Sequence, residues 1–143
     1  FKYLAFLDGD GQHKISDLEN LCSKMLEIKK GIIIGYREDL TNLNFSKKLG
    51  TEILNKFFLL IYKKKIFDIQ CGLRIFNTEE EKIKWNSSGL KHYFADAEIT
   101  CNAVMNKCKI TQIPIKTVRS EDYKGMNILF GLYLLIMIIC WRF

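Results

Sequence analysis

The feature that most constrains this chain is an apolar run, residues 3–7, that ends at a turn reading Asp-Gly-Asp-Gly-Gln-His. The run predicts a buried strand. A capping box at 16–19 and apolar residues at helical spacing then predict a helix that ends near Gly31. The β-branched segment 32–35 predicts a second buried strand. Strand, turn, helix and strand form a βαβ unit, so a mostly parallel sheet with a right-handed crossover is expected.

The rest of the chain alternates in the same way. Pro114 inside the final strand pattern predicts a strand end or an edge strand, because proline lacks the N–H that a central strand needs. The expected elements are a helix from Ser46, short extended pieces over 66–76, a helix capped at 78–81, a helix over 96–107 and a strand over 109–118.

Composition narrows the class of protein. The chain has 143 residues, of which 48% are hydrophobic and 27% charged, which suits one folded α/β domain. The net charge of +6 favours anionic partners such as nucleotides or phospholipid surfaces. Nucleic acid is not expected, because no arginine-rich stripe or aromatic-interleaved basic patch is present. The five cysteines include no CxxC pair, so neither a zinc framework nor a disulfide framework is predicted.

The turn after the first strand carries the most chemistry. Asp8 and Asp10 are two residues apart, so both carboxylates can converge on one hard cation. Gly9 and Gly11 let the backbone turn and allow a ligand to approach closely. The pattern predicts Mg²⁺ or Mn²⁺ that keeps coordination positions for phosphate oxygens, and a plain solvated turn is the alternative reading.

The end of the chain is strongly apolar from 126 to 141. About sixteen such residues fall short of the roughly twenty that span a bilayer unaided. We expect membrane contact, because Tyr133, Trp141 and Arg142 resemble interfacial anchors, and a buried core helix is the alternative. The expected division is a folded α/β portion over 1–120 and a membrane-associated or transmembrane helix over 121–143.

Four segments resemble, in order, the signatures of family 2 glycosyltransferases. The nearest branch is the group of dolichol-phosphate mannose synthase-like and bacterial polyprenyl-phosphate glycosyltransferases. The segments are Asp-Gly-Asp-Gly-Gln-His at 8–13, Ile-Gly-Tyr-Arg at 34–37, Asp-Ile-Gln-Cys-Gly-Leu-Arg-Ile-Phe at 68–76 and Ile-Pro-Ile at 113–115.

The resemblance implies a Rossmann-like GT-A fold and an inverting transfer that depends on Mg²⁺ or Mn²⁺. It also implies a nucleotide-sugar donor and a polyprenyl phosphate acceptor in the membrane, with the catalytic domain facing the cytoplasm. An oligomer or a membrane-protein partner is left open. The family opens with strands that carry the nucleotide-base contacts, and this chain begins after them. We therefore expect it to be incomplete at its N-terminus and inactive alone.

The resemblance also implies residue roles. The metal ligands map onto Asp8, Asp10 and Gln12, and a phosphate-binding role maps onto Arg37. Further phosphate or substrate contacts map onto Lys47, Thr51 and Asn55; at the first of these the family has arginine, so the bidentate fork is lost. The residues beside the reaction centre map onto Asp68, Gln70 and Arg74. An acidic position near the acceptor pocket maps onto Glu98.

Three further readings stay open. The first is an EF-hand-like calcium loop, since Asp8, Asp10, Gln12 and Glu19 fall at ligand positions of the twelve-residue loop. The second is a non-catalytic membrane-associated module. The third is that Arg37 and Arg74 are structural and pair with a nearby carboxylate such as Asp68. The lysine run 63–65 is read as a solvated helix end, or as a contact for anionic lipid.

Overall fold

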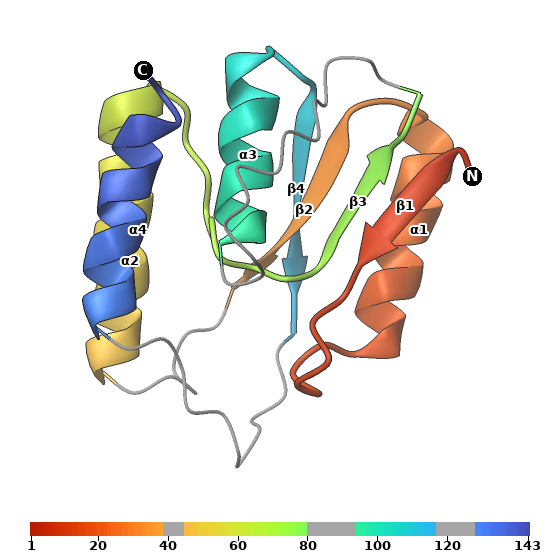
Figure 1. Ribbon diagram of the computed structural model, residues 1–143. Coiled ribbons are helices and arrows are strands. Elements are labelled where there is room, and N and C mark those ends of the chain that lie inside the picture. Colours follow the sequence, from red (N-terminus) through yellow and green to blue (C-terminus); the bar gives the residue numbers. More distant parts are fainter. Residues whose placement is uncertain (39–44, 80–93, 117–127) are drawn as a thin grey trace.

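The computed structural model describes residues 1–38, 45–79, 94–116 and 128–143, which form a layered α/β structure (Figure 1). The side chains at 46 and 47 also lie outside this description. The elements in chain order are β1 (Tyr3–Phe6), α1 (Ile15–Ile28), β2 (Ile32–Arg37), α2 (Phe45–Tyr62), β3 (Arg74–Asn77), α3 (Ala95–Met105), β4 (Ile110–Ile115) and α4 (Ile128–Cys140).

The four strands form one mixed sheet in the order β1-β3-β2-β4. β3 runs antiparallel to both of its neighbours, with Ala5 and Ile33 each opposite Ile75. Among these four described strands, β2 and β4 are the one parallel pair, with Ile33 opposite Thr111. The expectation of a mostly parallel sheet is therefore wrong. β1 and β2 do run in the same direction across the α1 crossover, but β3 returns between them.

This topology brings the ends of several strands together on one side of the sheet. The C-terminal ends of β1, β2 and β4 lie beside the N-terminal end of the antiparallel β3 (Figure 1). The segments that follow β1, β2 and β4 therefore lie close to the segment that precedes β3. In open α/β sheets, ligands bind outside such carboxyl ends. The α/β expectation is confirmed, and it places the candidate site at this edge.

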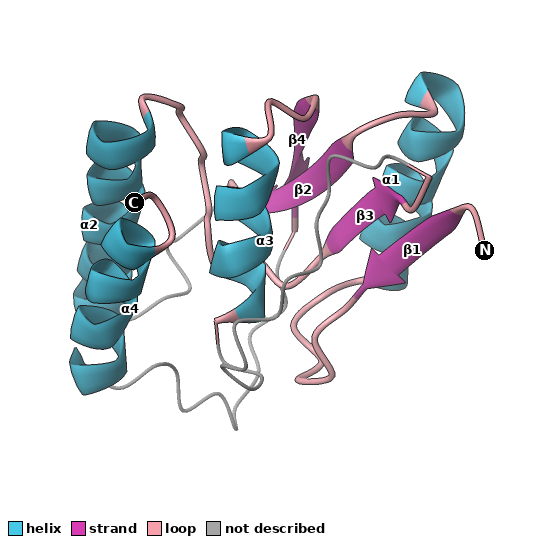
Figure 2. Ribbon diagram, turned by 45° about the horizontal axis from the view of Figure 1, so that its top comes forward, coloured by secondary structure: helices cyan, strands magenta, loops and turns pink. Residues whose placement is uncertain are grey.

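Helices cover both faces of the sheet, as Figure 2 shows. Side chains alternate along a strand, so Ile33 faces α1 while its neighbours Ile32 and Ile34 face α3. α2 and α4 lie beyond α3 and complete a third cluster, in which Phe58 and Ile138 are fully buried. The Tyr62 hydroxyl joins these two helices by donating to the Ile138 carbonyl oxygen, 3.1 Å away.

β1 lies at the edge of the described sheet. The predicted strand is confirmed, but its predicted burial is wrong, because Leu4 and Phe6 are 41% and 38% exposed. β1 has a strand neighbour, β3, on one side only within the described ranges. Its apolar side chains contact the sheet partly, as in the stack of Phe6 on Phe76.

α1 begins one residue earlier than its predicted cap. Lys14 occupies the N-cap position, and no side chain caps the helix there. The predicted capping box at 16–19 is therefore wrong. The Asp17 carboxylate instead accepts a hydrogen bond from the backbone N–H of Lys116, after β4. The predicted end is confirmed, because Lys29 is left-handed at the C-cap and Gly31 has a φ of 80°.

The later elements follow their sequence patterns closely. α2, α3 and β4 lie where helices and a strand are predicted, and Pro114 sits in β4 at a sheet edge as expected. The helix predicted from the cap at 78–81 lies largely outside the described residues.

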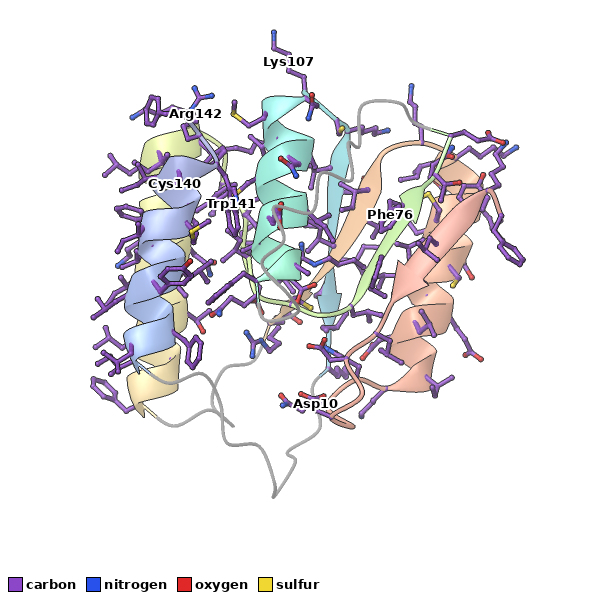
Figure 3. All side chains as sticks on the ribbon, viewed as in Figure 1. Asp10, Phe76, Lys107, Cys140, Trp141 and Arg142 are labelled. Atoms are coloured by element: carbon purple, nitrogen blue, oxygen red, sulfur yellow. The ribbon has the colours of Figure 1, made fainter. Side chains whose placement is uncertain are left out.

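The apolar C-terminal segment forms α4, which packs against α2 and α3 through Leu134 and Ile138. Trp141, just beyond the helix, packs against the same cluster (Figure 3). Within the described ranges, no helix has both the length and the apolar character needed to cross a membrane. The predicted hydrophobic helix is present as α4, but the structure does not support the prediction that it crosses a membrane.

Candidate functional site

The turn after β1 lies at the lower edge of the molecule, where Figure 3 labels Asp10. Gly11 has a φ of 74°, a conformation that suits glycine. The Asp10 carboxylate accepts hydrogen bonds from the Gln12 backbone N–H at 3.0 Å and the Gln12 side-chain amide at 2.7 Å. Two of the three predicted metal ligands, Asp10 and Gln12, are thus held together, and Gln12 is buried while Asp10 is exposed.

A single hollow joins this turn to the segment that precedes β3. Its lining brings together five of the predicted site residues and three that were not predicted. The lining residues are Asp8, Asp10, Gln12, His13, Arg37, Gln70, Cys71 and Gly72. Segments about 60 residues apart in the sequence therefore meet here because β1 and β3 are neighbours in the sheet.

Asp8 rests directly on the backbone of Gly72. A Cβ built at Gly72 would overlap all three atoms of the Asp8 carboxyl group. Gly72 is itself buried, and its φ is outside the left-handed region. Glycine is therefore required at this position for space, and the space it leaves is the place of the Asp8 carboxylate.

Arg37 and Asp68 form a bidentate ion pair beside the hollow. Arg37 Nε lies 2.6 Å from Asp68 Oδ2, and Arg37 Nη2 lies 3.0 Å from Asp68 Oδ1. The side chains are 9% and 2% exposed, so the pair is shielded from water. Asp68 Oδ1 also accepts the backbone N–H of Gln70 at 3.2 Å. The carboxylate thus orients both the arginine and the chain that lines the hollow.

Asn55 fixes the same segment from α2. Its side-chain amide donates to the Phe67 carbonyl oxygen at 2.6 Å, and its Oδ1 accepts the backbone N–H of Ile69 at 3.1 Å. These contacts give Asn55 a structural task. Its predicted phosphate contact stays a prediction.

Arg74 lies beneath the hollow with no exposed surface. Its Nε donates to the Cys71 carbonyl oxygen at 2.8 Å, and its Nη2 donates to the Ile69 carbonyl oxygen at 2.7 Å. Its Nη1 donates to the Asp96 carbonyl oxygen and to the Thr100 hydroxyl. Asp96 Oδ1 lies 3.2 Å from Nε. These contacts support the structural reading of Arg74, and its predicted part in the reaction stays a prediction.

Two carboxyl groups of the site have pKa values above their ordinary range. Partial burial raises the pKa of Asp8 most, and the negative charge of Asp10 raises it further, while His13, Arg74 and Arg37 act in the opposite direction. Burial also raises the pKa of Asp96, against the lowering effect of Arg74. Burial is the main cause of both shifts and neighbouring carboxylates add to it, so a bound cation would favour the charged forms of these groups.

The donor set fits a divalent cation that shares its ligands with a diphosphate. Two carboxylates and an amide oxygen suit Mg²⁺ or Mn²⁺, which commonly take one or two carboxylates together with substrate phosphates. In the part of the chain that the structure describes, no three or more His, Cys, Asp or Glu side chains are grouped to hold a metal. The residues fit a shared site better than a cage made of protein alone, and metal binding stays a prediction.

Two of the remaining predicted residues, Thr51 and Glu98, are not among those that line the hollow. Thr51 is buried within α2, and Glu98 is buried within α3. Lys47 belongs to the first turn of α2, but its side chain is outside the description. The roles predicted for these residues stay predictions.

Sequence reasoning missed the acidic residue that contacts Arg74. Asp68 was named as a possible partner of the arginines and Glu98 was placed near the acceptor, whereas Asp96 makes this contact from the first turn of α3. Asp96 and Glu98 belong to the same short acidic segment, and the position of Asp96 nearer the helix start is the only signal that distinguishes them. Gly72 and Cys71 lay within a quoted signature, but no pattern in the sequence showed that Gly72 makes room for Asp8.

The structure differs from that of an EF-hand. The segment before the turn is strand β1, whereas an EF-hand loop follows a helix. Glu19, at the twelfth loop position, lies within α1. The geometry therefore disfavours this alternative.

The chain is similar to enzymes named for sugar transfer to dolichyl phosphate. It is 29% identical over 130 residues to a UDP-N-acetylglucosamine–dolichyl-phosphate N-acetylglucosaminyltransferase of Methanococcus voltae, covering 87% of this chain and 52% of the relative. It is 29% identical over 133 residues to a dolichyl-phosphate β-glucosyltransferase of Trichomonas vaginalis, covering 85% and 40%. It is 27% identical over 130 residues to a dolichyl-phosphate β-glucosyltransferase of Saccharomyces cerevisiae, covering 80% and 39%.

No family model matches the chain. The chain spans about half the length of the first relatives it matches, at 52% and 59%. The chain is thus similar over most of its length to proteins named as glycosyltransferases, in agreement with the resemblance seen in the sequence.

The thiol in the hollow is predicted to be unreactive. Burial raises the pKa of Cys71 to about 12, so almost none of it is thiolate at pH 8. At that pH iodoacetamide should label the exposed Cys22 and Cys140 and leave Cys71 unlabelled, as read by peptide mass spectrometry. Unfolding in urea should make all five cysteines reactive. Labelling of Cys71 in the folded chain as fast as Cys22 would show that the hollow contains an accessible nucleophile.

Proposed function

We propose that this chain carries the metal-binding and acceptor-side part of an inverting glycosyltransferase. The enzyme would move a sugar from a nucleotide-sugar donor to dolichyl phosphate or another polyprenyl phosphate. The relatives support the acceptor class through their names. The choice of sugar and of nucleotide base is left open.

One geometric observation carries the proposal. Asp8, Asp10 and Gln12 at the end of β1 line the same hollow as Arg37 and Gln70. Oxygen ligands for a cation therefore lie beside a guanidinium and an amide, which is the combination that a diphosphate requires. The adjacent Arg37–Asp68 pair is largely buried, so its geometry is fixed before any ligand arrives.

The chemistry asks little of the protein beyond charge and position. A cation bound by Asp8, Asp10 and Gln12 would stabilise the leaving diphosphate. A phosphate monoester acceptor, with a second pKa near about 6, is largely dianionic at neutral pH and needs little help from a general base. Asp68 would hold Arg37 toward the phosphates, since both of its oxygens already accept from that guanidinium. Gln70 would line the approach to the reacting carbon.

The other predicted contacts form an outer set. Lys47 and Thr51 would assist phosphate binding from α2, and Glu98 would lie toward the acceptor. Asn55 would act through the 67–69 segment that it holds in place. Arg74 would act by supporting Gln70 and Gly72 from below.

We further propose that the outer face of α2 and α4 contacts the cytoplasmic surface of a membrane. Phe45, Ile128 and Leu129 are 81%, 78% and 69% exposed, and they stand at the starts of these helices. Both helices begin at the edge of the molecule where the candidate site lies (Figure 1). The exposed lysines at 63–65 follow the opposite end of α2, where they would add positive charge that suits anionic lipid along the same face. A membrane at this face would bring a lipid-linked acceptor close to the hollow.

The metal proposal predicts a diphosphate-dependent gain in Mn²⁺ affinity. Pyrophosphate should tighten Mn²⁺ binding to the 143-residue chain, because the two ligands share one coordination sphere. Asp8→Ala or Asp10→Ala should weaken Mn²⁺ binding by about tenfold or more and abolish the pyrophosphate effect. Free Mn²⁺ is measured by electron paramagnetic resonance.

The matched control is Asp17→Ala, which removes a carboxylate from α1 outside the hollow. It should leave Mn²⁺ affinity unchanged. Transfer to dolichyl phosphate from a panel of UDP- and GDP-sugars then tests the reaction in the protein that carries this chain. Unchanged Mn²⁺ binding in both aspartate variants would reject the metal assignment and leave a solvated turn or a non-catalytic module.

The membrane proposal predicts flotation with anionic liposomes. Replacing Ile128 and Leu129 by aspartate should reduce binding by more than tenfold, because burial of such a side chain contributes about 2 kcal/mol. Ile15→Asp is the control, since Ile15 is 62% exposed on α1, on the other side of the sheet. Retained binding in the double variant, with loss on neutralising the lysines at 63–65, would assign the contact to charge alone.

A further inference from the structure

We infer that Gly72 is a positioning residue for the predicted metal ligand Asp8, and that the buried Arg74 and α3 hold Gly72 in place. The inference rests on the proposed metal site and adds to it. It concerns a steric relation between two residues, which exists whether or not sugar transfer occurs.

The first step is the contact between the two residues. The Asp8 carboxyl group occupies the space that any side chain at Gly72 would need. Gly72 belongs to the segment that precedes strand β3, whereas Asp8 belongs to the turn after β1. A turn with two glycines is free to move unless something fixes its side chains. The Gly72 backbone limits where the carboxylate can lie.

The second step is that Gly72 cannot move away. The preceding carbonyl, that of Cys71, accepts from Arg74 Nε at 2.8 Å, and the Ile69 carbonyl accepts from Nη2 at 2.7 Å. The Cys71 backbone N–H donates to the Asp68 carbonyl oxygen at 3.4 Å. The backbone N–H and the carbonyl oxygen of Cys71, the residue before Gly72, are thus both hydrogen-bonded within the protein.

The third step connects this support to α3. Arg74 Nη1 donates to the Asp96 carbonyl oxygen and the Thr100 hydroxyl, and that hydroxyl donates to the same carbonyl at 2.9 Å. Arg74 and Thr100 are fully buried. A planar guanidinium with several fixed donors suits this task better than a lysine would. The first turn of α3 thereby positions the backbone on which Asp8 rests.

The consequence is that the effect of a side chain at Gly72 depends on the residue at position 8. Alanine at position 72 should displace the Asp8 carboxylate. When Asp8 is replaced by alanine, the space for a Cβ at position 72 becomes available. A residue that was needed only for backbone flexibility would show no such dependence on Asp8.

The test is a double-mutant cycle in the 143-residue chain, read by thermal unfolding without metal and by Mn²⁺ affinity. Gly72→Ala should lower Tm by about 5 °C in the wild-type background and by much less in the Asp8→Ala background. Gly72→Ala alone should also weaken Mn²⁺ binding by about tenfold or more. Gly50→Ala is the control, because a Cβ at Gly50 meets nothing within 4 Å, and it should leave Mn²⁺ affinity unchanged.

Two outcomes would overturn the inference. One is an equal loss of Tm for Gly72→Ala in both backgrounds, which would show no steric coupling with Asp8. The other is a Gly72→Ala chain that binds Mn²⁺ as tightly as wild type. If the Tm coupling is found while wild type itself binds no Mn²⁺, the steric relation stands and the proposed metal site fails. The Asp8→Ala/Gly72→Ala chain should fold even if Gly72→Ala alone does not.

Discussion

The buried guanidinium of Arg74 is the interaction on which the candidate site depends. An unpaired charge inside a protein is costly, so a fully buried arginine persists only where acceptors surround it. Here those acceptors are the carbonyls of Ile69 and Cys71 together with the start of α3. Without Arg74, the carbonyl oxygens of Ile69 and Cys71 would lose these hydrogen bonds. One side chain thus fixes an irregular segment, and the segment in turn forms the floor of the hollow.

The mixed sheet explains why this floor meets the predicted metal turn. β3 runs against its neighbours, so the chain that precedes it lies at the edge where β1 and β2 end. Asp8 arrives from β1, Arg37 arrives from β2, and residues 68–73 arrive from the opposite direction. An all-parallel order would send residues 68–73 to the other edge. The site therefore follows from the one strand whose direction the sequence pattern did not reveal.

Much of the local structure could be predicted from the sequence. Helical spacing located α1 and α2, and apolar or β-branched runs located β1, β2 and the C-terminal helix α4. Pro114 indicated an edge strand or a strand end, and β4 lies at the edge of the described sheet. The pairing of strands could not be predicted, because β3 is four residues long and carries no direction in its composition. The burial of β1 was predicted wrongly for a related reason. The sequence of an apolar strand does not show whether the strand lies at the edge of a sheet or at its centre. Among the site residues, Asp8, Asp10, Gln12, Arg37 and Gln70 were brought together. The support from Gly72 and Asp96 depends on contacts between distant segments, which spacing alone does not show.

The central claim is that residues 69–71 form a rigid floor and not a loose loop. Native-state hydrogen exchange of their backbone amides tests it most directly, since these amides donate to the Asn55 side chain, the Asp68 carboxylate and the Asp68 carbonyl oxygen. The account predicts that they open with a free energy close to that of the buried β2 amides, and that Arg74→Met lowers their protection more than it lowers that of α1. Exchange as fast as that of the exposed amides at Gly9 and Gly11 would contradict it.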